Sequence, residues 1–384
     1  MCIFLRLNAI TWASCKLFLV VVLLLGSVTP VHATPPAQTF GGDPLNAFPH
    51  LFPALLTLPA PAWVREGQRV SYYVQSATFA QSFEDAGNAG AGFMQHDIVA
   101  VDRKNVVVAS QLYLDTGAGV TPAGVFGASF LPGVGDFWLN PAVLENAEAV
   151  ANDELAVVHM PATIAEQEYD AVRFEYRTGE SVTVSMFDTA TGLLIYFRHT
   201  VGDDPATTRQ SSELYLLGRR QLRLPWRGVR APAWLAPGDV LDYAGSRSVY
   251  VAGAPSGEFP ESARGSVKLA QGRWSAFAVS NYLAGSLTGA SARVTGVSQL
   301  SGALWLPAAA LKANVRAGVI DRDPVTGITV AYVRNPDRSV TLRETGDLFQ
   351  IDNTYDQRTG QLIAARIETR TGLAMQVTEL YFSE

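Results

Sequence analysis

The sequence predicts a mainly β fold built from two tandem, duplicated antiparallel β-sheet domains, each a curved sheet, half-barrel or sandwich with one short helix. Two observations carry this prediction: apolar residues recur with a period of two, and one long pattern of residues occurs twice. The chain has 384 residues, of which 48% are hydrophobic and 17% charged. A chain of this length and composition can bury a substantial core and is not disordered.

The period of two indicates strands with one buried face and one wet face. In the segment 181–188, Val182, Val184 and Met186 alternate with small polar residues, and the runs 328–333 and 340–344 alternate similarly. The pattern Asp-x-x-Thr-Gly recurs at three places: 188–192, 323–327 and 356–360. Aspartate can cap a tight turn and glycine supplies the positive φ that closes it, so these segments predict antiparallel hairpins.

The duplication is visible as ordered matches at a nearly constant offset. Ala-Pro-Ala-Trp at 60–63 recurs at 231–234, and Glu-Leu-Tyr at 213–215 recurs at 379–381, with the offset drifting from 171 to 166. Chance matches would scatter, whereas these keep their order. Because each copy is large enough to hold its own core, we expect two domains. The helix of each copy is expected at Pro141–Val150 and at Pro307–Val315, since proline suits a first helical turn.

The predicted organisation has five parts. It comprises a signal peptide at 1–33, a proline-rich leader at 34–59, a first β domain at 60–218, an arginine-rich linker at 219–230 and a second β domain at 231–384. The linker contains five arginines in twelve residues. One interpretation is contact with an anionic lipid, polymer or wall surface. The interpretation we favour is a strand end followed by a solvated linker, because arginine also covers neighbouring apolar surface.

The first 33 residues have the pattern of a secretory signal. Arg6 and Lys16 precede an apolar run at 17–28, and Val31-His-Ala33 provides the small residues of a cleavage site. The run is too short to cross a membrane, which takes about 20 residues. We therefore expect a mature protein that begins at Thr34, is secreted or periplasmic, and has no membrane span. Its lack of cysteine excludes disulfides and thiolate chemistry and is typical of bacterial export.

Charge and motif content exclude several function classes. Without Arg6 and Lys16 the mature chain has 27 basic and 35 acidic residues, a net charge of −8, which argues against a nucleic-acid partner. The mature histidines are His50, His96, His159 and His199, all before residue 200 and without metal-site spacing, and the second copy has none. Serine-hydrolase elbows and phosphate-binding loops are absent from the sequence. We therefore predict no metal, no cofactor and no assigned catalytic residue.

Paired carboxylates provide the enzymatic alternative. Glycoside hydrolysis needs two of them, one as acid and one as base or nucleophile. The acidic clusters in the first copy are Glu166, Glu168 and Asp170, and Asp97 with Asp102. In the second copy, Asp321 and Asp323 resemble half of a calcium loop but lack its glycine and distal glutamate. The alternative is an extracytoplasmic, glycosidase-like hydrolase with its pair in the first copy or in the cleft between copies.

Six aromatic residues retained in both copies are the candidate binding residues: Trp63, Tyr72, Trp138, Trp234, Tyr243 and Trp305. They could form a platform for a sugar or lipid, although packing in the core is the interpretation we favour. In particular, we expect Trp138 and Trp305 to fix the helix of each copy against its sheet.

The leading hypothesis is an exported, non-enzymatic bacterial protein that binds a lipid, glycan or protein ligand through its duplicated β domain. In general outline, exported curved sheets with one helix each resemble the bacterial half-barrel carriers of lipids and lipoproteins. Because no specific motif accompanies this resemblance, it implies a fold and assigns no site residue.

Overall fold

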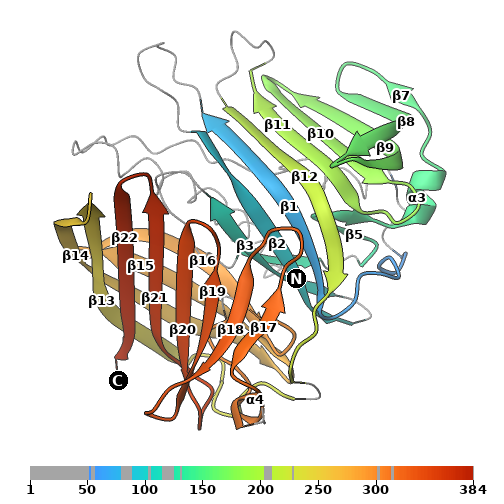
Figure 1. Ribbon diagram of the computed structural model, residues 1–384. Coiled ribbons are helices and arrows are strands. Elements are labelled where there is room, and N and C mark those ends of the chain that lie inside the picture. The colour runs from blue at the N-terminus through green and yellow to red at the C-terminus, as the bar shows by residue number, and fades with distance from the viewer. Residues whose placement is uncertain are drawn as a thin grey trace.

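The computed structural model describes residues 52, 57–78, 89–102, 105–114, 125–129, 132–202, 210–226, 229–300, 303–312 and 315–383. The predicted signal peptide and most of the leader therefore lie outside the described residues. The described chain forms two ten-stranded antiparallel sheets, one after the other along the sequence, with a small two-stranded sheet and two short helices (Figure 1). The predicted fold class is confirmed. None of the helices in the described part is long and apolar enough to cross a membrane.

The first sheet has the strand order β4-β3-β2-β1-β12-β11-β10-β9-β8-β7. The first strand, β1, thus pairs with the last, β12, at the middle of the sheet. Its strands are β1 Gln68–Thr78, β2 Ala89–Val101, β3 Val106–Leu114, β4 Val125–Ser129, β7 Val150–Ala151, β8 Leu155–Ile164, β9 Gln167–Thr178, β10 Ser181–Asp188, β11 Leu194–Val201 and β12 Gln210–Gln221.

The second sheet repeats this order as β16-β15-β14-β13-β22-β21-β20-β19-β18-β17. Its first strand, β13, again pairs with its last, β22. Its strands are β13 Val240–Val251, β14 Ala254–Gln271, β15 Trp274–Leu283, β16 Ser286–Gly296, β17 Gly318–Arg322, β18 Thr329–Arg334, β19 Ser339–Thr345, β20 Phe349–Asp356, β21 Leu362–Thr371 and β22 Ala374–Ser383.

Each sheet is crossed by a short segment that carries its helix. In the first sheet this segment contains β5 (Val134–Gly135), β6 (Trp138–Leu139) and α3 (Pro141–Glu145), and in the second it contains α4 (Ala308–Lys312). The helices begin close to where the sequence predicted them, and α3 is shorter than the predicted Pro141–Val150. In α3 the side chain of Asn140 caps the first turn through Ala142 N. At the end of the helix, the side-chain amide of Asn146 donates a hydrogen bond to the backbone carbonyl of Ala142, in place of a continuing helical N–H.

The three Asp-x-x-Thr-Gly turns have the predicted geometry. Gly192, Gly327 and Gly360 have φ values of 71°, 73° and 78°. In each turn the glycine N–H donates to the backbone carbonyl of the aspartate four residues earlier, and the aspartate carboxylate accepts backbone N–H groups inside the turn. These turns join β10 to β11, β17 to β18, and β20 to β21.

The expectation of one wet face holds for some strands and fails for others. In β18, Val330 and Tyr332 are buried while the residues between them are partly exposed. In β10, however, Thr183 and Ser185 are only 6% and 4% exposed, as buried as Val184 at 2%. The alternation in the sequence therefore identifies the strand correctly, but it does not predict that the polar face of β10 is also buried.

Each sheet has its own hydrophobic core, into which its crossing segment packs. Phe52 and Leu58, at the end of the leader, pack against the first core, and the Phe52 ring lies 5.9 Å from that of Phe174. His96 is also part of this interior: it stacks on Phe137 at 4.5 Å, and burial lowers its pKa to about 3. His96 is therefore neutral at physiological pH.

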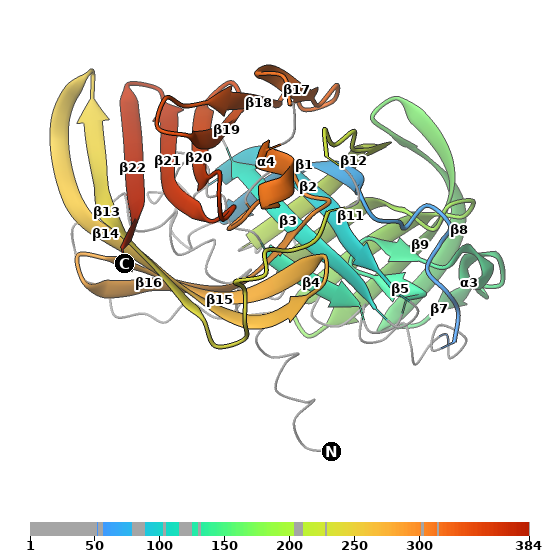
Figure 2. The ribbon, with the colours of Figure 1, turned by 90° about the horizontal axis from the view of Figure 1, so that it is seen from below.

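The two sheets also pack against each other, as the view in Figure 2 shows. Tyr113 of the first sheet stacks on Phe349 of the second at 4.8 Å and donates a hydrogen bond to Glu344. Arg220 of β12 forms ion pairs with Asp321 and Asp323. The contact between sheets thus combines aromatic stacking with buried charge pairs.

Candidate functional site

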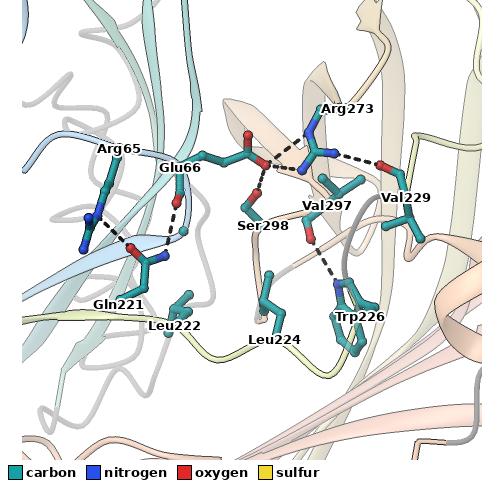
Figure 3. Close-up of a pocket in the computed structure, with 11 residues that line it drawn as sticks. Arg65, Glu66, Gln221, Leu222, Leu224, Trp226, Val229, Arg273, Val297 and Ser298 are labelled. Carbon is teal, nitrogen blue, oxygen red and sulfur yellow. Dashed lines mark hydrogen bonds and ion pairs between the residues drawn. The ribbon is translucent and has the colours of Figure 1, made fainter.

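The connection from β12 to β13 crosses from one sheet to the other and is anchored on both (Figure 3). Leu222 N donates to Gly67 O at 2.8 Å in the first sheet. The Trp226 indole is 4% exposed and donates to Val297 O at 3.0 Å in the second. Between these anchors the chain leaves a groove of about 580 Å³. We call it the junction groove.

The junction groove has an apolar floor and polar walls. The apolar lining residues of the connecting segment, which we call the floor, are Leu222, Leu224, Trp226 and Val229. The turn at 65–67 and Gln221 line the groove on the side of the first sheet, which we call its first wall. The wall on the second sheet consists of Arg273, Val297 and Ser298. A groove with this lining accommodates a small ligand that has an apolar body and a polar group.

Glu66 links the two walls. Its carboxylate accepts hydrogen bonds from Arg273 Nε at 3.2 Å and from the Ser298 hydroxyl. Arg273 also donates to Val229 O at 3.1 Å, which fixes the floor. Of the described residues that line the groove, Glu66 alone carries a carboxylate. Because this carboxylate is already paired, the groove has no acid–base couple of the kind that glycoside hydrolysis uses.

The charged residues that line the groove are two arginines, Arg65 and Arg273, and one acid, Glu66, and further arginines adjoin it in the sequence. Arg65 is exposed and donates through Nε to Gln221 at 3.0 Å. Arg219 lies over the Trp63 ring at 4.9 Å, and burial together with the nearby Arg65 lowers its pKa. Arg223 and Arg230 are exposed on the linker. This excess of positive charge, in a chain of net charge −6, favours an anionic ligand.

The predicted linker at 219–230 is partly strand. Arg219 and Arg220 belong to β12, as the strand-end interpretation expects, so the strand extends past the predicted boundary at 218. Arg220 is committed to its ion pairs, whereas Arg223 and Arg230 remain exposed.

The six predicted aromatic residues do not line the junction groove. Trp138, Trp305, Tyr72 and Tyr243 are 1%, 0%, 0% and 5% exposed. Trp63 and Trp234 are half-buried against the two cores. This burial supports the packing interpretation, and a binding role for these six remains a prediction.

The aromatic pairs make equivalent hydrogen bonds in the two sheets. The Trp63 indole donates to Thr191 O at 2.7 Å, and that of Trp234 donates to Thr359 O at 2.9 Å. The hydroxyl groups of Tyr72 and Tyr243 donate to Leu194 O and Leu362 O at 2.9 and 3.1 Å. In each copy, the tryptophan and the tyrosine thus connect the first strand region to one hairpin, β10–β11 in the first copy and β20–β21 in the second.

The predicted carboxylate pairs do not converge on the groove. Asp97 is locked to Arg69, while Asp102 accepts from Asn105 in an exposed turn. Glu166 and Glu168 are exposed at the β8–β9 hairpin. Asp321 and Asp323 share Arg220. Among the described residues there is also no cluster of three or more metal-ligating side chains.

Sequence reasoning missed Glu66, Trp226, Arg273 and Ser298. They come from four separate segments, and they meet only because the two sheets pack together. The one signal in the sequence was the arginine-rich linker, which contains Trp226 and borders the groove.

Comparison with known proteins finds no matching family model and no curated relative. The likeness to solved structures is weak, as two examples show. One is a protein of unknown function from the DUF3598 family of Nostoc punctiforme, with 10% identity and a TM-score of 0.15, covering 82% of this chain and 95% of that chain. The other, from Nitrosomonas europaea and provisionally named AttH, has 9% identity and a TM-score of 0.16, covering 82% and 92%. Scores this low carry no argument about function.

Proposed function

We propose that this is an exported, non-enzymatic binding protein that holds a small amphipathic anion in the junction groove. The observation that carries the proposal is the combination of an apolar floor with the excess of exposed arginine around it. An apolar body would lie on Leu224 and Val229, and the negative group would face Arg65. The Glu66–Arg273 pair would tie the two walls together at one end of the groove.

Export is supported by the signal pattern of residues 1–33 and by a mature sequence without cysteine. The protein released from a bacterial host should begin at Thr34. N-terminal sequencing of the released protein checks this expectation, and recovery of an intact residue 1 would contradict it.

The ligand class is tested with two fluorescent probes that differ in one charge. 1-Anilinonaphthalene-8-sulfonate carries a sulfonate, and N-phenyl-1-naphthylamine is its neutral counterpart. We expect the mature protein to bind the sulfonate probe about tenfold more tightly, which corresponds to about 1.4 kcal/mol. Arg65→Gln should remove most of this preference. Leu224→Asp should lower the affinity for both probes, because it places a charge on the apolar floor.

The matched control is Arg264→Gln, on the outer face of the second sheet, where 61% of the side chain is exposed. It removes the same charge far from the groove and should leave both affinities unchanged. Equal affinities of wild type, Arg65→Gln and Leu224→Asp for the sulfonate probe would refute the assignment of the ligand to this groove.

A further inference from the structure

Arg293 of β16 lies on the face of the second sheet that carries its core. In the strand register it is directly opposite Phe277, which is in turn opposite Val267, and residues opposite each other share a face. Two residues further along β16, the hydroxyl of Thr295 accepts a hydrogen bond from Leu304 N in the crossing segment. Arg293 therefore projects from the inner face of the sheet, among apolar side chains.

This guanidinium lacks a counter-charge. Its Nε is buried without a hydrogen-bond partner. Burial lowers the pKa of Arg293, and the one titratable side chain that acts on it is the phenol of Tyr243. A cation with a buried, unpartnered N–H group and no paired anion is costly, so natural proteins seldom keep one without a use.

Several other arginines of the same sheet are paired with a carboxylate, whereas Arg293 is not. Arg247 forms a bidentate pair with Glu261, and Arg264 and Arg343 pair with Asp242 and Asp352. These pairs satisfy the ordinary rule for arginine in a sheet, namely a carboxylate on a neighbouring strand.

The inner-face carboxylates are already occupied. Glu261 accepts from Arg247 and from the hydroxyl of Thr378. Glu344 accepts from Tyr113 and Gln111 of the first sheet. The described chain thus supplies no free carboxylate to Arg293, although the residue is only partly buried and part of it remains open to solvent.

We propose that Arg293 binds the carboxylate of an amphiphilic monocarboxylic acid whose apolar chain lies along the inner face of the second sheet. Tyr243 and Phe277 lie beside it as part of the buried core beneath the site. Ala263, Leu380 and Phe382 are partly buried there and continue the apolar face. This site is separate from the junction groove and does not depend on the proposal made for it.

The test uses 11-(dansylamino)undecanoic acid and its methyl ester, with mature protein from which copurifying lipid has been extracted. Wild type is expected to bind the acid at least tenfold more tightly than the ester. Arg293→Met should abolish this preference while retaining binding of the ester. Because methionine removes a partly buried charge that has no paired carboxylate, the variant without ligand should also melt at a higher temperature than wild type.

Two controls make the outcome decisive. Arg264→Met removes a charge from the opposite face of β14, two strands away from β16, and should leave the acid preference intact. Arg65→Gln, in the junction groove, should also leave it intact, and loss of preference in that variant would place the probe in the groove and overturn the proposal. A wild type without acid preference, or an Arg293→Met variant that keeps the preference and melts lower, would likewise overturn it.

Discussion

Replacing Trp305 by alanine is expected to lower the free energy of unfolding of the second sheet by about 3–5 kcal/mol. Trp305 is fully buried, and its indole donates to the Ser275 hydroxyl at 2.6 Å. Its backbone bridges to Gln361, so the residue connects the crossing segment with the hairpin that follows β20. Truncation would leave a cavity and an unpaired hydroxyl at the centre of this core. Denaturant unfolding followed by tyrosine and tryptophan fluorescence measures the loss.

The matched variants are Trp138→Ala in the first sheet and Trp305→Phe. Trp138 is 1% exposed and donates to Pro132 O, so its truncation should destabilise the first sheet by a similar amount. Trp305→Phe keeps most of the packing and should cost much less than alanine. If Trp305→Ala unfolds like the parent but loses probe binding, the indole contacts a ligand and the packing interpretation is wrong.

The sequence was most informative where a residue has the same task in both copies. The indoles of Trp63 and Trp234 each donate to the carbonyl of the threonine in an Asp-x-x-Thr-Gly turn. Because this hydrogen bond needs both the tryptophan and the turn, both are present at the same spacing in the two copies. The glycine of that turn is constrained in the same way. A Cβ on Gly192 would lie 1.7 Å from Leu139 O, and one on Gly360 would lie 1.9 Å from Leu306 O. Internal repetition therefore predicted the sheets and their turns.

The contact between the sheets escaped prediction because it uses different faces of the two copies. Arg69 and Val240 occupy corresponding positions, three residues before Tyr72 and Tyr243. Arg69 is 2% exposed and Val240 is 50% exposed, the reverse of what their side chains favour. The junction groove arises from the same asymmetric contact. At the offset of 171 its residues Arg65 and Glu66 correspond to Ala236 and Pro237, so the repeat pattern does not mark them. Such a contact depends on how two finished sheets meet, which local periodicity does not encode.

The buried pair formed by Arg69 and Asp97 predicts a large effect at this contact. Arg69 Nε and Nη2 donate to the two carboxylate oxygens of Asp97 at 2.6 and 2.8 Å, and the two side chains are 2% and 5% exposed. Burial alone would lower the pKa of Arg69, but the adjacent carboxylate more than offsets this and raises it. Asp97→Ala leaves a buried guanidinium without its partner and should cost about 3–5 kcal/mol.

Removing both charges together should be far less damaging than removing one. In the double variant Arg69→Met, Asp97→Leu, apolar side chains of similar length meet Val107 and Ala109, which already contribute to an apolar cluster between the sheets. We expect its unfolding free energy to lie close to that of the parent, because the desolvation cost of two ions disappears with their attraction. A double-mutant cycle from denaturant unfolding gives the coupling energy. If the two single effects simply add in the double variant, the side chains do not act as a pair, and the contact between the sheets is held by its aromatic and apolar residues instead.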